Sequence, residues 1–250
     1  MKKLLSIMVL FPMAFLVYGQ DHQETHMYES IYLTPKLDAI SKLSENMAAH
    51  NKKYHGEGDH AAFVQNVVAG KRSGQMVWVM GPGTYAHLDS RPAEGGHDED
   101  WANNVLPYLE KMSNIEYWRR TSQYYVPEGY DADKIRIRFY KVKRGQNEDF
   151  VAHYGKLVQV FNEKKYDRQL SIFQSTFPSA TGRNMASVTS FDNWADLDKG
   201  LPVGKDFDSI HGEGSWAKWL QELQDLTEWS DQEVRELMPE MSGTLVVDVD

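Results

Sequence analysis

The stretch FVQNVVAGKRSGQMVWVMGPGTYAHLD, residues 63–89, decides the fold, because a second copy of its pattern lies 109 residues further along the chain. The copy reads IFQSTFPSATGRNMASVTSFDNWADLD over residues 172–198, and six of the 27 aligned positions are identical. The identical pairs are Gln65 and Gln174, Met76 and Met185, Val79 and Val188, Ala86 and Ala195, Leu88 and Leu197, and Asp89 and Asp198. Self-similarity on this scale indicates an internal duplication, so we expect the two halves to fold alike.

Both halves carry the same expected order of elements. In the first half, alternating apolar residues and turn residues predict strands at 28–34, 62–69 and 75–80, and helical spacing predicts helices over 37–54 and 98–120. In the second half, the same patterns predict strands at 134–142, 169–177 and 184–189 and helices over 147–165 and 215–238. A last strand is expected in each half, at 124–126 and at 244–249. The order β-α-β-β-α-β is the ferredoxin-like unit.

Two such units in one chain resemble the dimeric α+β barrel superfamily with both barrel halves fused. The resemblance rests on element order and duplication, and it covers nearly all of residues 28–250. It implies an α+β fold in which one ferredoxin-like repeat, 28–130, and a second, 131–250, close into a single barrel. The superfamily includes cofactor-independent monooxygenases, haem-degrading enzymes and relatives of chlorite dismutase. No catalytic residue carries over, because a shared fold does not by itself fix a function.

The first residues predict export. Two lysines at positions 2 and 3 precede a mostly apolar run over 4–17, and Gly19 supplies a small residue at the expected cleavage point. Such a run is typical of a signal peptide, here 1–19, and is too short to cross a bilayer comfortably. Residues 20–27 are polar and are expected to form a flexible segment. No other stretch is apolar enough to span a membrane, so we expect the mature protein in the periplasm or outside the cell.

Composition excludes several classes of function. The formal net charge of −9 argues against nucleic acid as a partner. The chain has no cysteine, which excludes disulfides, thiol catalysis and cysteine-bound metals. The sequence also lacks a phosphate-binding glycine loop before a helix and the Gly-x-Ser-x-Gly turn of hydrolases. A small molecule is therefore the expected partner, and homo-oligomer formation is left open.

Two histidines lie on apolar helical stripes. His50 falls between Met47 and Tyr54, and His153 falls between Phe150 and Leu157. Each is expected to face the sheet or a cavity above it, where an imidazole can act as a general base or as a haem ligand. The alternative is a core histidine with one satisfied hydrogen bond.

The duplicated glutamines are candidates for ligand binding. Gln65 and Gln174 each fall inside a predicted strand with apolar neighbours on the same face. A buried amide needs polar partners, so the two residues are expected to sit symmetrically in the barrel and bind a polar group. The alternatives are that the two glutamines hydrogen-bond each other or that they lie on a face of the sheet that is exposed to water. Three further residues are candidates for an apolar wall or for packed core: Met76, Trp78 and Met185.

The loop after the first helix offers a weaker metal site. His55, Glu57 and His60 fall within the sequence His-Gly-Glu-Gly-Asp-His, and nitrogen and oxygen ligands of this kind suit Zn²⁺ or Mn²⁺. The alternative is a polar, glycine-containing loop. The run His97-Asp98-Glu99-Asp100, before the second helix, offers the same kinds of ligand, and its alternative is the preference of acidic residues for a helix N-terminus.

Two functions follow from these patterns. The first is a binding protein that holds a small, largely apolar molecule in the barrel or under its helices. The alternative is a cofactor-free monooxygenase or haem-processing enzyme of the α+β barrel type that uses His50 or His153. The sequence does not decide whether a metal or haem is bound.

Overall fold

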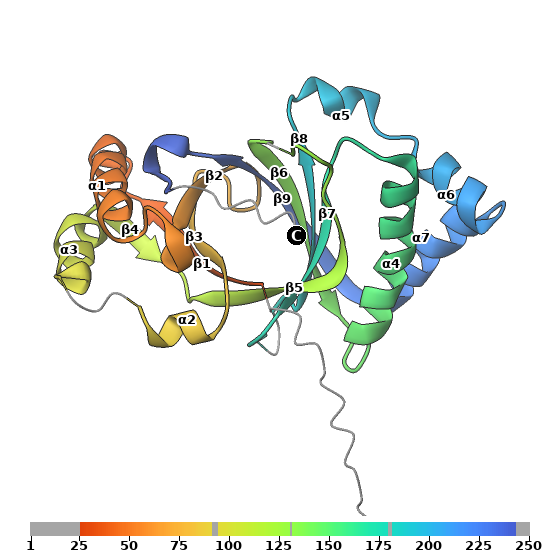
Figure 1. Cartoon of the computed structure of the whole chain (residues 1–250), viewed down its shortest axis with the longest axis horizontal. Helices are drawn as coiled ribbons and strands as arrows, with labels where there is room; N and C mark the ends of the chain where they lie inside the picture. The colour runs from red at the N-terminus through yellow and green to blue at the C-terminus, as the bar shows by residue number, and fades with distance from the viewer. Residues whose placement is uncertain (1–25, 92–94, 131, 180–181, 244–250) are drawn as a thin grey trace, which may run out of the picture.

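The computed structural model describes residues 26–91, 95–130, 132–179 and 182–243. Eight strands form a closed antiparallel barrel, which lies between two groups of helices in Figure 1. Around the barrel the strands follow the order β1-β3-β2-β9-β6-β8-β7-β5, and β5 pairs with β1 to complete the ring. The short strand β4 pairs with the C-terminal end of β1.

The elements follow one another in the same general order in both halves. The first half contains β1 (Met27–Pro35), α1 (Ile40–Tyr54), β2 (Ala62–Gly70), β3 (Met76–Gly83), α2 (Ala86–Asp89), α3 (His97–Asn104), β4 (Leu109–Met112) and β5 (Glu116–Tyr125). The second half contains β6 (Lys134–Val142), α4 (Asn147–Lys164), β7 (Leu170–Ser175), β8 (Met185–Phe191), α5 (Ala195–Lys199), α6 (Val203–His211), α7 (Ser215–Leu226) and β9 (Thr227–Leu237). Short 3₁₀ turns cover Gly58–His60, Leu106–Tyr108 and Pro239–Met241.

Two predicted helices are wrong in their C-terminal parts. The helix expected over 98–120 ends at Asn104, and the helix expected over 215–238 ends at Leu226. The chain that follows forms β5 and β9, two strands of the barrel. In β9 the residues that face the barrel interior include charged ones, so the apolar alternation that marks a strand is missing from the sequence. Pairing with β2 and β6 overrides the helical preference of this segment.

Within the described residues, the other strand predictions, except the one at 124–126, and the helices over 37–54 and 147–165 are confirmed to within a few residues. The strand expected at 124–126 is only the C-terminal end of β5, which begins at Glu116 and ends at Tyr125. The polar segment expected over 20–27 gives way to β1 at Met27, which is buried. The predicted leader, residues 1–19, most of the polar segment and the predicted strand 244–249 lie outside the described residues. Within the described residues, no helix combines the length and apolar character that a membrane crossing requires.

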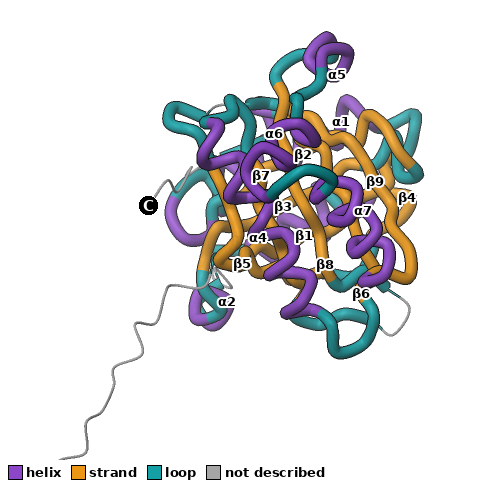
Figure 2. Tube along the Cα trace, turned by 90° about the vertical axis from the view of Figure 1, so that its right-hand side faces the viewer, coloured by secondary structure: helices purple, strands orange, loops and turns teal. Residues whose placement is uncertain are grey.

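Each strand presents one face to the helices and the other to the barrel interior. Helices α1 and α3 cover one side of the barrel, and α4, α6 and α7 cover the opposite side, where they stand in front of the strands in Figure 2. Leu43 and Met47 anchor the first helical layer, and Phe150, Phe161 and Phe207 anchor the second. Burial of each such side chain contributes about 1.5–3 kcal/mol. These outer layers hold the ring of strands closed and leave its interior to a separate set of residues.

Candidate functional site

The barrel interior contains a cavity of about 240 Å³. Its walls are mostly apolar, because residues of all eight strands point inward and most of these are aromatic or branched. The apolar lining consists of Tyr28, Phe63, Val79, Gly81, Pro82, Trp118, Val126, Ile135, Ile137, Phe139, Phe173, Ala186 and Val188. A cavity with such walls favours a small molecule that is itself largely apolar.

A few polar groups reach the same cavity. Arg235 of β9 and Gln65 of β2 line it from neighbouring strands, and both are more than 90% buried. The Nη1 group of Arg235 donates to Oε1 of Gln65 over 3.4 Å. The remaining polar lining comes from Ser30, Arg120, Tyr130 and Gln169. Few polar groups on apolar walls are typical of a site that orients a ligand by one end.

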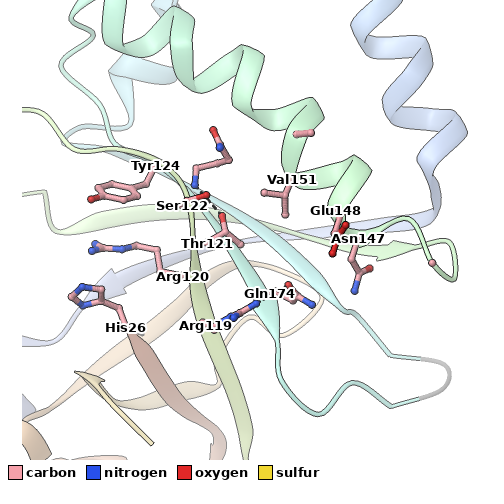
Figure 3. A pocket seen from close by; sticks show the side chains of 13 residues that line it. His26, Arg119, Arg120, Thr121, Ser122, Tyr124, Asn147, Glu148, Val151 and Gln174 are labelled. Atoms are coloured by element: carbon pink, nitrogen blue, oxygen red, sulfur yellow. Dashed lines mark hydrogen bonds between the residues drawn. The ribbon is translucent and has the colours of Figure 1, made fainter. Parts of the chain in front are cut away.

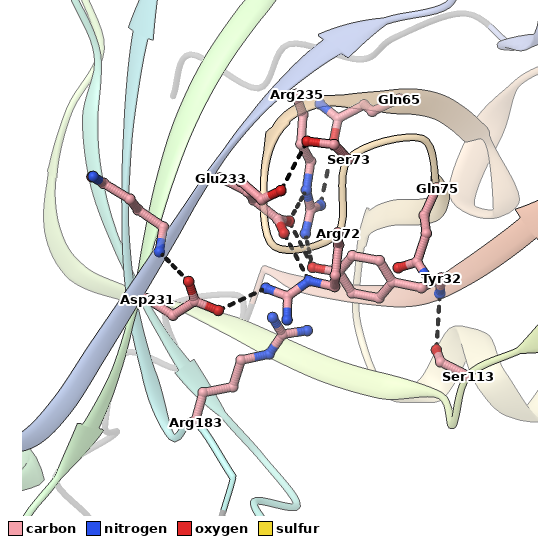
Figure 4. Close-up of polar contacts among 12 residues, drawn as sticks. Tyr32, Gln65, Arg72, Ser73, Gln75, Ser113, Arg183, Asp231, Glu233 and Arg235 are labelled. Atoms are coloured by element: carbon pink, nitrogen blue, oxygen red, sulfur yellow. Dashed lines mark hydrogen bonds and ion pairs between the residues drawn. The ribbon is translucent and has the colours of Figure 1, made fainter.

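A buried ionic network closes the cavity beyond Arg235 (Figure 4). Oε1 of Glu233 accepts hydrogen bonds from Nε of Arg235 and from the Tyr32 hydroxyl, each over 2.7 Å. Oε2 of Glu233 accepts from Nε of Arg72 over 2.8 Å. Nη2 of Arg235 in turn donates to the Tyr32 hydroxyl over 2.6 Å. The carboxylate is thus bonded at both oxygens, which lets a charged group persist in the interior.

The charges around Glu233 set its protonation. Burial by itself raises the pKa of Glu233, but the positive charges of Arg235 and Arg72 and the Tyr32 hydroxyl outweigh burial and hold this pKa below its usual value. Burial raises the pKa of Tyr32, so its hydroxyl stays protonated. At neutral pH the network therefore contains an ionised carboxylate and a neutral phenol.

Arg183 extends the network across the barrel. Its Nε and Nη2 groups donate to the two carboxylate oxygens of Glu116 over 3.2 and 2.6 Å, and its guanidinium lies 3.8 Å from the centre of the Phe139 ring. Arg72 also lies 3.8 Å from Asp231. The inner end of the cavity therefore gathers three arginines, Arg72, Arg183 and Arg235, against three carboxylates, Glu116, Asp231 and Glu233.

This arrangement can bind an oxygen that carries negative charge. A guanidinium has five N–H groups, and the network described above engages three of those on Arg235. Within the described part of the chain, this leaves two N–H groups of Arg235 that can donate to a carbonyl, an ionised hydroxyl or a carboxylate of a molecule in the cavity. Hydrogen bonds of this kind are strong because the donor is charged and water is largely excluded.

Of the two predicted glutamines, only Gln65 lines the barrel cavity. Gln174 lies on the outer face of β7, where Nη2 of Arg119 donates to its Oε1 over 3.3 Å. Figure 3 shows it in a groove outside the barrel, across from Glu148 and Val151 of α4. The expected symmetric pair is therefore not formed.

A one-residue difference between the two hairpins explains this outcome. The β2–β3 hairpin places Phe63 opposite Val79, and the β7–β8 hairpin places Ser171 opposite Val188. If Val79 matches Val188, as the shift of 109 requires, then the match of Phe63 is Ser171, one residue short of that shift. The structural match of Gln65 is thus Phe173, which also lines the cavity. A slip of one residue moves a strand residue to the opposite face.

The three predicted wall residues face the helices and not the cavity. Met76 and Trp78 pack beneath α1 with Leu43 and Met47, and the indole N–H of Trp78 donates to the side chain of Asn51 over 3.0 Å. Met185 is buried in the core formed with α4, α6 and α7. All three belong to the packed core that the sequence left as the alternative.

His153 is buried outside the barrel. Its ring stacks on Trp219 at 4.6 Å, its Nε2 donates to the Trp219 carbonyl over 3.0 Å, and its Nδ1 lies 3.5 Å from Glu222. Burial lowers its pKa. The described residues do not fit a haem here, because Nε2 of His153 is bonded to a backbone carbonyl and the ring is buried against Trp219. His153 is not among the residues that line the barrel cavity.

His50 is also buried outside the barrel, on the face of α1 that packs against α3. Its Nδ1 lies 2.7 Å from Asp100 of α3, and burial lowers its pKa despite that carboxylate. The part of the chain that the structure describes therefore brings neither predicted catalytic histidine to the barrel cavity.

The residues of the predicted loop metal site are not brought together. Glu57 is exposed, and Nε2 of His60 donates to the carbonyl of His87 over 2.8 Å. His55 is buried and turns toward a different histidine, His97, with 3.0 Å between their Nε2 atoms. Burial lowers the pKa of His55 to about 4, so its imidazole is neutral at pH 7.

Sequence reasoning missed most of the polar network. Glu233 and Arg235 fall in the segment 215–238, for which the sequence predicts a helix, although charged residues at every second position around Val234 are also compatible with a strand. Arg72 and Arg183 lie in the hairpin turns of the two halves. The shift of 109 residues does not align them in the sequence. The sequence also predicts a helix at Trp118, so it does not indicate that this residue lines the cavity.

Comparisons with known proteins identify the fold. No family model and no curated protein matches the sequence. Solved structures do match, among them a candidate monooxygenase of Lactobacillus acidophilus at 14% identity and a TM-score of 0.57, covering 90% of this chain and 100% of that one. An anthrone oxidase-like protein matches at 13% identity and a TM-score of 0.53, covering 87% and 92% of the two chains. A chlorite dismutase variant of Candidatus Nitrospira defluvii matches at 8% identity and a TM-score of 0.55, covering 87% and 94%. The architecture is that of the dimeric α+β barrel proteins.

Proposed function

We propose that the barrel cavity binds a small, largely apolar molecule that carries one carbonyl or ionised hydroxyl group. The observation that supports this most directly is an apolar cavity that ends at a buried arginine, Arg235, with N–H groups left to donate. The apolar walls would bind the body of the molecule. Arg235, supported by Gln65, would bind its oxygen.

We further propose that the bound molecule is oxidised by dioxygen in a monooxygenase reaction. A methylene that is activated through the aromatic rings by a ketone loses a proton to solvent water to give an enolate, and the Arg235 guanidinium would stabilise the negative oxygen. The enolate supplies the electrons, so that one oxygen atom of O₂ becomes a new carbonyl and the other leaves as water. The fold shared with a candidate monooxygenase and an anthrone oxidase-like protein supports this choice, and the reaction needs no cofactor.

Anthrone is a suitable probe because its conversion to anthraquinone balances as anthrone plus O₂ giving anthraquinone plus water. We expect anthrone to quench the fluorescence of Trp118, which lines the cavity, and to be converted with one O₂ consumed per anthraquinone formed. The measurements are a fluorescence titration, an oxygen electrode and chromatography of the product. Trp118→Phe serves as the control that assigns the quenching.

The outcomes of these measurements test ligand binding and oxidation separately. Quenching without oxygen uptake above the spontaneous rate would leave a binding protein and reject the oxidation. Neither quenching nor uptake, for anthrone and for the smaller phenol 1-naphthol, would reject the cavity as a ligand site.

We also infer that the barrel consists of two tandem ferredoxin-like repeats. The strand order β2-β3-β1-β5 in one half corresponds position by position to β7-β8-β6-β9 in the other, which supports the inference. A crystal structure in which residues 28–130 and 131–250 superpose strand for strand would agree with it. A different pairing order would contradict it.

Export of the chain is a further proposal, supported by the basic and apolar residues over 1–19. We expect the mature protein to begin at Gln20 and to be recovered from the periplasm or the medium. N-terminal sequencing of the protein from fractionated cells measures this. Recovery of the full-length chain from the cytoplasm would reject export.

A further inference from the structure

Three histidines from separate segments meet outside the barrel, under the first helical layer. His50 lies on the buried face of α1, and His55 is the residue that ends α1. His97 begins α3, after Gly96 turns the chain in the left-handed conformation with φ of 80°. His50 and His55 are almost fully buried, and the side chain of His97 is 20% exposed.

The rings converge through one nitrogen each. Ligand nitrogens of His50, His55 and His97 all lie within 4.8 Å of one another, and the Nε2 atoms of His55 and His97 are 3.0 Å apart. The other nitrogen of each ring is already bonded. Nδ1 of His50 is 2.7 Å from Asp100, Nδ1 of His97 is 2.7 Å from Asp98, and Nδ1 of His55 is 2.9 Å from the His60 carbonyl.

These partners fix where the protons lie. A carboxylate and a backbone carbonyl only accept hydrogen bonds, so Nδ1 is the protonated nitrogen in each neutral ring. Each Nε2 then presents a lone pair. At 3.0 Å the lone pairs of His55 and His97 repel unless a positive species lies between them. Nε2 of His50 is buried and has no hydrogen-bond partner in the described part of the chain.

We propose that His50, His55 and His97 bind a divalent transition-metal ion of the zinc type through their Nε2 atoms. Zinc binds imidazole at about 2.0–2.1 Å, which places two ligands of a tetrahedral ion roughly 3.4 Å apart. The Nε2 atoms of His55 and His97 are near that spacing, and the His50 ligand nitrogen lies within 4.8 Å of those of His55 and His97. Three protein nitrogens leave the fourth position to water, and His97 is the ligand nearest to solvent.

The surroundings match those of a metal site. Carboxylates and carbonyls on the far nitrogens of metal-binding histidines orient the rings and raise their basicity, and Asp100, Asp98 and the His60 carbonyl supply them here. Aromatic rings enclose the three histidines: Tyr54, Trp78 and Trp101. The site lies on the opposite face of β3 from the cavity, so its occupancy is independent of the proposed oxidation.

Zinc binding to the full chain tests this proposal. Protein stripped with a chelator is loaded with ZnCl₂, passed through gel filtration and assayed for zinc by mass spectrometry. We expect one zinc per chain for the wild type and none for His97→Ala. Asp100→Asn replaces the carboxylate beside His50 Nδ1 with a neutral amide and is expected to weaken zinc affinity by about 10–100-fold in competition with a fluorescent chelator. Co²⁺ in place of zinc is expected to give the visible absorption of a tetrahedral site.

The matched control is His60→Ala, because it removes an imidazole from the same loop but keeps the backbone carbonyl that holds His55. It is expected to retain one zinc per chain. Circular dichroism verifies that each variant is folded, and His50→Ala replaces His97→Ala if the latter is not. The proposal is overturned if the wild type fails to retain zinc, or if His97→Ala (or its replacement His50→Ala) retains as much zinc as the wild type. It is also overturned if His60→Ala loses as much zinc as His97→Ala.

Discussion

Glu233→Gln is expected to lower the free energy of unfolding by about 3–5 kcal/mol, because it removes the charge that balances the buried Arg235 and the partly buried Arg72. Glu233 is 1% exposed and bonds to Arg235, Arg72 and Tyr32, so the neutral amide leaves guanidinium groups unpaired inside the barrel. Urea denaturation followed by circular dichroism measures the change. Glu236→Gln on the same strand is the control, since Glu236 forms a surface ion pair with Lys134 and is expected to contribute about 0–1 kcal/mol. Equal losses in the two variants would contradict the network.

The same carboxylate gives stability a predictable response to acid. The pKa of Glu233 is lower in the folded than in the unfolded protein, so its stabilising contribution is complete above the unfolded-state pKa. That contribution is lost as the pH falls through the folded-state pKa. Wild type should therefore lose more stability than Glu233→Gln between neutral pH and the acid range. Parallel curves for the two proteins would show that Glu233 titrates alike in both states.

Ala186→Phe is expected to weaken the binding of 1-naphthol by about 100-fold or more, equivalent to roughly 2.7 kcal/mol. Ala186 is buried on β8 opposite Phe139 and Phe173 and lines the cavity, so a benzyl side chain there occupies the space of the ligand. The readout is the quenching of Trp118. Val188→Phe, one inward position along the strand, is the second variant if Ala186→Phe does not fold.

The control for this substitution is Ala152→Phe. Ala152 is exposed on α4 and lines the outer groove of Figure 3, so the same change there should leave naphthol affinity unaltered. A loss of binding in Ala152→Phe with unaltered binding in Ala186→Phe would place the ligand in the groove and contradict the barrel site.

Local patterns predicted the strands well where inward residues are apolar, as in Ile135, Ile137 and Phe139 of β6. They failed for β5 and β9, because the inward residues there include Glu116, Glu233 and Arg235, and the carboxylates of Glu116 and Glu233 pair with arginines of distant hairpin turns. The periodicity of a single sequence shows which side chains are polar, but it does not show which distant residues neutralise their charges. The helical prediction consequently ran through both strands.

The candidate sites could also be predicted only where they depend on local sequence and not on contacts between distant segments. Gln65 could be predicted as a buried strand residue, but the face of Gln174 depends on the hairpin register that a uniform shift of 109 does not preserve. His50, His55 and His97 are each visible in the sequence as unusual histidines. The three side chains come together only because α1 packs against α3, although His55 and His97 are 42 positions apart in the sequence. Such contacts are set by tertiary structure and leave no fixed spacing to detect.

The most direct test of the central claim is a crystal structure of the protein soaked with 6-bromo-2-naphthol, located by the anomalous scattering of its bromine. The account predicts a bromine peak among the apolar residues of the barrel cavity, with the naphthol oxygen within hydrogen-bond distance of Arg235. A cavity filled by rearranged side chains, or bromine bound only in the outer groove of Figure 3, would contradict it.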